Sequence, residues 1–304
     1  MTFEIGGTRE PFTYFARTRS CWTCPSSARS LLWRKLPRMD EPLRIAWLYP
    51  DLLSTYGDYG NVVAFAQRAM KRGFGTRISK ISDLQELTEF DPDFAILGGA
   101  QDCDQEAVAA SLTSREYDLR RILDRGTVML AICAGYQLLG NSYATAAGRA
   151  FRGAGILNVD TVASEHRIVG YAAIKSRLEG VGTIVGFENH AGCTSLSSEV
   201  EPMGSVLFGG GNNGRDGSEG AVCGNVIATY LHGPVLPANP RLADYLLLRC
   251  LQRRGTVKSL VSLDDSEEFD VHDVMLDRAR QRLYCREETR LHRRVFGAKP
   301  SLRC

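Results

Sequence analysis

Hydrophobic residues follow two different spacings in the first part of the chain after residue 40. Apolar positions at helical spacing predict helices over 62–70, ended by Gly73, and over 104–125. Short runs that are apolar throughout predict buried strands between the helices. Those strands are expected at 43–49, 77–81, 94–97 and 127–132. Continuously apolar strands that alternate with helices are typical of a mostly parallel sheet flanked by helices, so we predict an α/β fold.

The pattern changes after residue 150. Three short strands separated by glycines are expected at 156–162, 168–174 and 183–187, and we predict that they add β-rich structure to the same sheet. A glycine-rich loop at 209–214 precedes one more apolar strand at 225–231. Two helices with an apolar stripe follow, at 239–254 and 270–284.

These patterns divide the chain into three parts. Residues 1–40 show no clear period, and we predict an extension that is disordered or lies upstream of a true start at Met39. Residues 41–265 are predicted to form one α/β domain, a length within the range of single domains of this class. Residues 266–304 are predicted to be a C-terminal helix with a basic tail.

Composition and charge narrow the classes of function. The chain has 304 residues, of which 44% are hydrophobic and 24% charged, and this excludes a wholly disordered chain. The net charge is +2 (37 basic minus 35 acidic residues), and the excess of basic residues lies in the two ends. Residues 41–284, between these ends, carry no basic stripe, and this argues against nucleic-acid binding. No apolar run approaches the ~18 residues that span a bilayer, so we predict no membrane insertion.

The cysteines indicate a reducing compartment. Nine cysteines, an odd number, are scattered over the chain, which is typical of free thiols in a cytoplasmic protein. Cys21 and Cys24 form a CxxC pair with no second pair of ligands nearby. Because a structural zinc ion usually takes four ligands, we predict no metal site from this pair.

Cys133 stands where a nucleophile would be expected. It directly follows an apolar strand and precedes a helical segment, in Leu130-Ala-Ile-Cys-Ala-Gly-Tyr-Gln-Leu-Leu139. A nucleophile elbow needs small residues two positions before and after the nucleophile, and here they are Ala131 and Gly135. The helix N-terminus would favour a thiolate and offer N–H groups to an oxyanion. A buried, inert cysteine is the alternative interpretation.

A thiol nucleophile needs a base, and the chain has five histidines. His232 ends the apolar strand at 225–231, so it would lie at the same sheet edge as Cys133 and is the favoured partner. His190, in Phe187-Glu-Asn-His-Ala-Gly192, is the rival, with a structural role in a turn as its alternative. His272 and His292 are expected to be solvated on the C-terminal helix and tail.

Five segments between Leu43 and Tyr284 together resemble the class I glutamine amidotransferases, within them the cobyric-acid-synthase-like branch. In that branch they are most similar to glutaminase subunits that serve in the amidation of the peptidoglycan precursor lipid II. The segments are Tyr56-Gly-Asp-Tyr-Gly-Asn61, Gly98-Gly-Ala-Gln-Asp102, Cys133-Ala-Gly-Tyr-Gln137, Gly186-Phe-Glu-Asn-His190 and Tyr230-Leu-His-Gly-Pro234.

The resemblance implies roles for individual residues. Cys133 matches the nucleophile of the family and His232 its base. The backbone N–H groups of Gly99 and Ala134 would form the oxyanion hole. The mechanism that follows is hydrolysis of glutamine to glutamate and ammonia through a glutamyl thioester on the cysteine.

Two further residues are implied as substrate ligands. Arg167, in Glu165-His-Arg-Ile-Val-Gly170, matches an arginine that binds glutamine, and a guanidinium suits that role because it pairs a carboxylate at two points. From the residues alone, a surface arginine on a strand would be the preferred interpretation. Gln137 is expected to line the same pocket.

One departure and one absence point to a partner subunit. Most class I glutaminases follow the base with Pro-Glu, whereas this chain has His232-Gly-Pro, so the carboxylate that orients the base would come from elsewhere in the chain or, as we prefer, from a partner. The chain has no Gly-x-x-x-x-Gly-Lys-Ser/Thr loop. The resemblance therefore implies a heterodimer with a MurT-like Mur-ligase subunit, which would bind ATP and Mg²⁺ and amidate D-glutamate of lipid II.

Three alternatives remain at this stage. The chain could serve a cobyrinate-type amidation, although cobalamin enzymes usually carry the ATP-using domain on the same chain. It could be a non-catalytic scaffold or regulator of a synthetase, which a substitution of Cys133 would test. It could also be a different cysteine hydrolase built on the same elbow.

Overall fold

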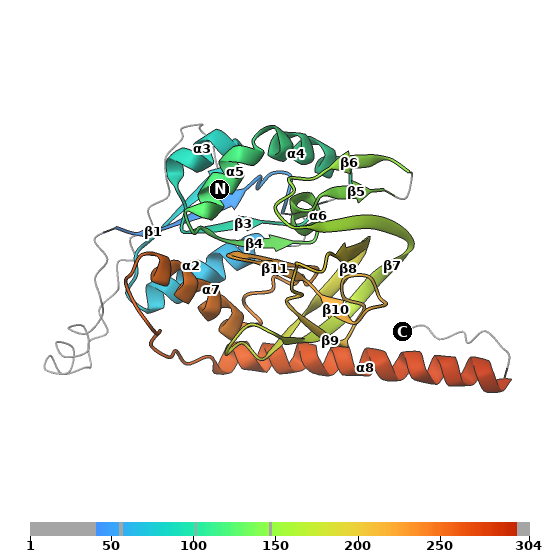
Figure 1. Ribbon diagram of the computed structural model, residues 1–304. Coiled ribbons are helices and arrows are strands. Elements are labelled where there is room, and N and C mark those ends of the chain that lie inside the picture. Colours follow the sequence, from blue (N-terminus) through green and yellow to red (C-terminus); the bar gives the residue numbers. More distant parts are fainter. Residues whose placement is uncertain (1–40, 55–56, 101, 146–147, 297–304) are drawn as a thin grey trace, which may run out of the picture.

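The computed structural model describes residues 41–54, 57–100, 102–145 and 148–296. Two sheets and the helices around them make up this part of the chain (Figure 1). The predicted extension at 1–40, with the CxxC pair of Cys21 and Cys24, lies outside the described residues.

The first sheet has six strands in the order β11-β12-β4-β3-β1-β2. All neighbours in it are parallel except β11, which pairs antiparallel with β12 at one edge. This arrangement confirms the predicted α/β fold with a mostly parallel sheet. The strands are β1 (Leu43–Leu48), β2 (Thr76–Ile81), β3 (Phe94–Leu97), β4 (Val128–Ile132), β11 (Ala221–Cys223) and β12 (Val226–Thr229).

Helices cover both faces of this sheet. Helices α3, α4 and α5 lie over one face and α2 and α7 over the other, and the short helix α6 follows β4 (Figure 1). The helices are α2 (Tyr59–Lys71), α3 (Leu84–Phe90), α4 (Asp102–Ser114), α5 (Glu116–Asp124), α6 (Ala134–Leu139) and α7 (Pro240–Arg253).

Two helix predictions need correction. The single helix expected over 104–125 is two helices, because the backbone leaves the helical region at Arg115 (φ −123°, ψ 26°). Acidic residues in the first turn of α5 favour a new helix start there, since they lie near the positive end of its dipole. The hydrophobic pattern did not predict helix α3, because seven residues make too few turns for a helical period to be recognised. Its start is fixed by Asp83, whose side chain accepts the N–H of Gln85 at 2.8 Å.

The second sheet lies beside the first and is separate from it. Its order is β10-β9-β7-β5-β6, with β8 pairing with β7. The prediction of three short strands added to the central sheet is therefore wrong: they are parts of two long strands, and Gly170 lies inside one of them at φ 136° without ending it. The strands are β5 (Ser142–Ala144), β6 (Ala150–Arg152), β7 (Val159–Ser176), β8 (Thr183–Leu196), β9 (Gly204–Phe208) and β10 (Ser218–Glu219).

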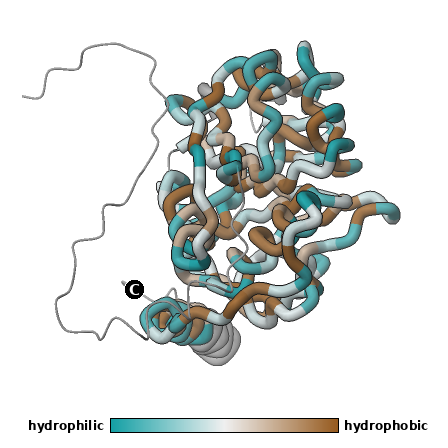
Figure 2. The backbone as a smooth tube through the Cα atoms, turned by 90° about the vertical axis from the view of Figure 1, so that its left-hand side faces the viewer, coloured by the Kyte–Doolittle hydropathy of each residue, from teal (hydrophilic) through white to brown (hydrophobic). Residues whose placement is uncertain are grey.

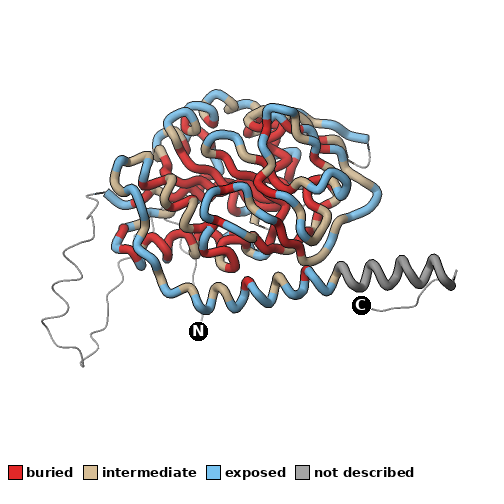
Figure 3. Tube along the Cα trace, turned by 60° about the horizontal axis from the view of Figure 1, so that its bottom comes forward, coloured by how far each residue is buried: buried red, intermediate tan, exposed pale blue. Residues whose placement is uncertain are grey.

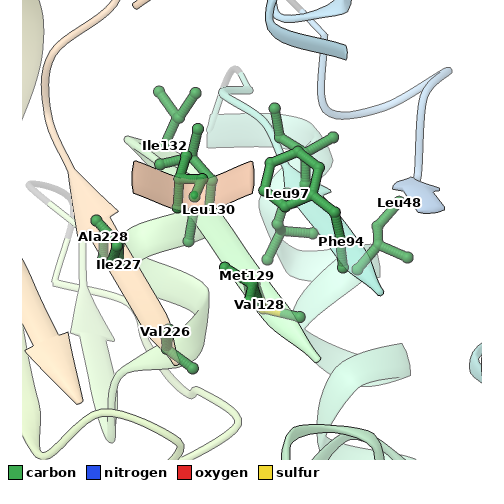
Figure 4. Packing of buried hydrophobic residues seen from close by; sticks show 14 of the residues in the cluster. Leu48, Phe94, Leu97, Val128, Met129, Leu130, Ile132, Val226, Ile227 and Ala228 are labelled. Carbon is green, nitrogen blue, oxygen red and sulfur yellow. The ribbon is translucent and has the colours of Figure 1, made fainter. Parts of the chain in front are cut away.

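The main hydrophobic core surrounds the first sheet. Strands β3, β4 and β12 are buried at every position, and Figure 4 shows their apolar side chains together with Leu48 of β1. Phe65 of α2 stacks on Phe94 of β3 with ring centroids 4.0 Å apart. Buried segments run through the centre of the molecule (Figure 3), and hydrophobic segments gather there (Figure 2). This rigid sheet fixes the positions of the loops at its carboxyl edge.

Helix α8 (Ser266–Phe296) passes along the second sheet and contacts β7, β8 and β9 (Figure 1). Its described part is largely exposed on the outer side (Figure 3). The expectation that His272 is solvated is wrong: this side chain is buried, and Nε2 lies 3.3 Å from the carbonyl oxygen of Thr183. Among the described residues, no helix combines the length and the apolar character needed to cross a membrane.

Candidate active site

Cys133 occupies a strained turn between β4 and α6. Its backbone has φ 50° and ψ −102°, a region that residues with a side chain rarely adopt. The residue is held there because its N–H donates to the carbonyl of Thr229 on β12 at 2.8 Å. Gly135 is required two residues later, since a Cβ at that position would lie 2.4 Å from the carbonyl oxygen of Leu97. These features are those of a nucleophile elbow.

The elbow places Cys133 beside the N-terminus of α6, and the residue is 5% exposed. The first N–H groups of a helix have no partner within the helix, so that of Ala134 is suited to receive an oxyanion. Gly99, the other predicted donor, follows β3 at the same sheet edge. In this structure its N–H donates to Oδ2 of Asp58 at 2.7 Å.

His232 reaches the same edge from the neighbouring strand. Ile132 of β4 pairs in register with Thr229 of β12, so Cys133 and His232 follow the ends of two adjacent parallel strands. The backbone of His232 is fixed by two hydrogen bonds to Phe187 of β8, one in each direction, at 2.8 and 3.0 Å. The predicted juxtaposition of thiol and imidazole at one sheet edge therefore follows from the topology.

The electrostatics of the site favour a neutral imidazole. Burial, followed by the nearby His190 and the positive charge of Arg167, together lower the pKa of His232 to about 4. The imidazole is therefore unprotonated near neutral pH. An unprotonated histidine is the form that accepts a proton from a thiol.

His190 lies close to this site but is held as a structural residue. It belongs to β8 rather than to a turn, and its ring stacks on Tyr230 with centroids 3.8 Å apart and 10° between the planes. Nδ1 lies 2.8 Å from the carbonyl oxygen of Gly192, so this nitrogen carries the proton and donates it. Burial lowers the pKa of His190 to about 4.

The lowered pKa of His190 predicts a pH-dependent stability. The unfolded state takes up a proton below about pH 6.5, whereas the folded state does so only near pH 4. Stability therefore falls as the pH falls through this window. Relative to His190→Asn, whose amide can still donate to Gly192, the wild-type protein is expected to lose up to about 3 kcal/mol of unfolding free energy between pH 7 and 4. Urea denaturation of both proteins at each pH measures the difference, and a difference that stays constant with pH would contradict the prediction.

The two predicted glutamine ligands have different surroundings. Arg167 lies on β7 and donates from Nε to the Asn189 side chain at 2.6 Å and from a terminal nitrogen to the Asn189 carbonyl at 3.1 Å. Its positive charge contributes to the lowered pKa values of His190 and His232, so Arg167 lies near both histidines. Gln137 is buried in α6 and donates from Nε2 to the hydroxyl of Tyr230 at 3.1 Å.

Residues 44–240 match the family described as the CobB/CobQ-like glutamine amidotransferase domain. This chain belongs to that family. The matched range contains the six predicted site residues of this amidotransferase: Gly99, Cys133, Ala134, Gln137, Arg167 and His232.

Two curated relatives of this amidotransferase match it over most of their own length. The lipid II isoglutaminyl synthase (glutamine-hydrolyzing) subunit GatD of Staphylococcus aureus is 37% identical over 237 residues, which cover 78% of this chain and 96% of GatD. The subunit of the same name from Streptococcus pneumoniae is 36% identical over 213 residues, covering 70% and 82%. The cobyric acid synthase of Xanthobacter autotrophicus is 30% identical over 154 residues, but these are only 30% of that protein.

Three buried carboxylates around the amidotransferase site were not anticipated. Glu188 accepts the N–H groups of Gly210 and Gly211, so the glycine-rich loop anchors a carboxylate. Glu219 accepts the N–H of Tyr230 at 2.9 Å, and burial raises its pKa to about 7. The third is Asp58. Asp58 and Glu188 each lie in one of the five segments that resemble the family. Nothing else in the sequence indicated that these two carboxylates belong near the site.

Proposed function

We propose that this chain is the glutamine-hydrolysing subunit of a lipid II isoglutaminyl synthase and that it acts in the cytoplasm. The similarity to GatD, which extends over 96% of the Staphylococcus aureus subunit, supports this assignment most directly. The strained Cys133 and a neutral His232, at the ends of adjacent strands, add the chemistry of a glutaminase. A cobyrinate-type amidation is a secondary alternative, because the match covers only about a third of the cobyric acid synthases.

In the proposed first step, His232 accepts the Cys133 proton, and the thiolate attacks the side-chain amide carbon of glutamine. The C–S bond forms while the carbonyl oxygen becomes an oxyanion, which the N–H groups of Ala134 and Gly99 would hold. Each such donor contributes ~3–4 kcal/mol in other enzymes. His232 then gives its proton to the leaving nitrogen, and ammonia departs as the C–N bond breaks.

The second step releases glutamate. A water molecule gives a proton to His232 and attacks the glutamyl thioester, the C–S bond breaks, and the proton returns to the Cys133 sulfur. The sum is glutamine plus water giving glutamate plus ammonia, and no other reactant is needed. Two N–H donors and one histidine thus serve both halves of the reaction.

The ammonia would be used by a partner. We propose a heterodimer with a MurT-like Mur-ligase subunit that binds ATP and Mg²⁺ and activates the D-glutamate carboxyl of lipid II, so that ammonia converts it to D-isoglutamine. We further propose that this partner supplies the carboxylate that orients His232, since the sequence His232-Gly-Pro departs from the usual Pro-Glu continuation. Activity would then depend on assembly, which prevents wasteful hydrolysis.

The decisive experiment measures glutamate release from glutamine by the purified chain, alone and with its MurT-like partner. We expect activity that rises sharply with the partner and requires Cys133. Strong activity of the chain alone would place the orienting carboxylate within this chain. No activity that depends on Cys133 in either sample would leave a scaffold role and reject the glutaminase proposal.

Arg167 provides a separate prediction about substrate binding. Arg167→Lys keeps the positive charge but loses the two-point contact with a carboxylate. We expect the KM for glutamine to rise about 10- to 100-fold, the equivalent of one charge-assisted hydrogen bond, while kcat changes little. Steady-state kinetics of the assembled enzyme would measure both constants. A fall in kcat with unchanged KM would contradict a role in substrate binding.

A further inference from the structure

Asp58 is a buried carboxylate that its position in the fold does not explain. It directly precedes helix α2, a position where an aspartate usually accepts N–H groups of the first helical turn. Its side chain makes no such capping bond. Instead it is completely buried and turns toward the loop after β3.

The hydrogen bonds of Asp58 are few for a buried carboxylate. Oδ2 accepts the N–H of Gly99 at 2.7 Å. Oδ1 is buried and has no hydrogen-bond partner among the described residues. Burying a charged oxygen without a partner is costly, so native proteins rarely retain such an arrangement without a functional reason. Burial raises the pKa of Asp58 to about 6, which brings its protonated form close to neutral pH.

The peptide between Gly98 and Gly99 is held at both ends. Its N–H points to Asp58, and its carbonyl oxygen accepts the N–H of Gly135 on α6 at 3.1 Å. Because the two groups of a trans peptide point in opposite directions, the carbonyl faces the elbow helix and the N–H faces away from it. An oxyanion hole built with Gly99 needs the reverse orientation, with the N–H toward the elbow.

We propose that Asp58 is a positioning residue that holds the Gly98–Gly99 peptide in a resting orientation, and that glutamine hydrolysis requires this peptide to rotate so that the Gly99 N–H faces Cys133. This inference rests on the proposed glutaminase function. Asp58 acts through the peptide and does not itself contact glutamine.

The local sequence permits such a rotation. A peptide that turns over changes ψ of the residue before it and φ of the residue after it, and glycines at both positions accept such changes most readily. No other residue fits at Gly98, where a Cβ would lie 2.2 Å from the Leu53 carbonyl oxygen and 2.7 Å from Oδ2 of Asp58.

The two forms of Asp58 would favour different orientations. An ionised carboxylate attracts the Gly99 N–H and so stabilises the resting orientation. After rotation the Gly98 carbonyl would face Asp58, and two oxygens with negative charge repel each other. A protonated carboxyl or an amide could donate a hydrogen bond to that carbonyl instead. Asparagine at this position can therefore stabilise both orientations.

Asp58→Asn provides the kinetic test. We expect kcat for glutamine hydrolysis to rise at least fivefold in the chain without its partner, with KM within twofold of wild type, because the active orientation becomes more populated. The matched control is Asp93→Asn at the opposite end of β3, where Oδ2 also accepts a backbone N–H, that of Arg44, at 2.7 Å. This control is expected to leave kcat unchanged. An unchanged or lower kcat in folded Asp58→Asn would overturn the proposal.

A second measurement uses the wild-type chain and does not depend on how the variant folds. The chain is treated with a diazoketone analogue of glutamine that alkylates the nucleophile, and the structure of the adduct is determined. We expect the Gly99 N–H to contact the oxygen of the bound analogue and no longer Asp58. An adduct in which Gly99 still donates to Asp58 would overturn the proposed rotation. Failure of the analogue to label Cys133 even in the complex with the MurT-like partner would instead reject the glutaminase function.

Discussion

Cys133→Ser is expected to lower glutamine hydrolysis by about 10⁴-fold or more, as removal of a catalytic nucleophile does in other enzymes. A serine hydroxyl is far less acidic than a thiol, so His232 would not generate the nucleophile at neutral pH. The side chains are nearly the same size, so the strained turn at φ 50° should be preserved. Glutamate release by the assembled enzyme measures the effect.

Cys250→Ser is the matched control for this result. Cys250 is buried like Cys133, but it lies on α7, where its Sγ is 3.3 Å from the Asp93 carbonyl oxygen. Burial raises the pKa of this thiol, so it is an inert structural cysteine. We expect this variant to keep its activity. If Cys133→Ser retained more than a tenth of wild-type activity, the proposed covalent mechanism would be wrong.

Gly135→Ala is expected to have the second largest effect. We expect kcat to fall at least 100-fold and the free energy of unfolding to fall by about 1–3 kcal/mol. The added Cβ would lie 2.4 Å from the carbonyl oxygen and 2.9 Å from the carbonyl carbon of Leu97, and a backbone in the central sheet cannot move aside. Helix α6 must therefore shift away from β3. That shift carries Cys133 and the Ala134 N–H out of position.

Gly75→Ala shows whether the result is specific to the elbow. A Cβ at Gly75 would lie 3.5 Å from the nearest atom, a side-chain carbon of Pro42, which is an ordinary contact. We expect activity and stability close to wild type for this variant. Steady-state kinetics and thermal unfolding of both variants make the comparison, and normal kinetics in a folded Gly135→Ala protein would contradict the close packing of α6 against β3.

The local sequence was sufficient for the parallel sheet and for the elbow. A strand that is apolar at every position, such as Val128–Ile132, must be covered on both faces, so the pattern alone indicates a buried parallel strand. The elbow at Cys133 could be predicted because its constraint is local: the backbone turn requires small neighbours such as Ala131 and Gly135, and these are visible in the sequence. His232 followed from the same reasoning, because it directly succeeds a second apolar strand.

Other features were hidden because they depend on contacts between distant segments. The glycines in 153–190 suggested strand ends, yet Gly170 lies within β7, because pairing with β8 holds the backbone through it. His272 appeared solvated on a polar helix, and the packing of α8 against the second sheet buries it. Such outcomes are decided by which surfaces meet, and periodicity within one segment does not contain that information.

The sequence by itself therefore determined the fold class, the nucleophile elbow and the placing of Cys133 and His232 at one sheet edge, since each follows from rules that act over a few residues. The tertiary structure decided the rest. It assigned His190 to a structural role, through its stacking on Tyr230 and its bond to Gly192. It also directed the Gly99 N–H to Asp58, 41 residues earlier in the chain. Hydrogen bonds between segments so far apart form only when the sheet brings the loops together at its edge, so the folded chain alone shows them.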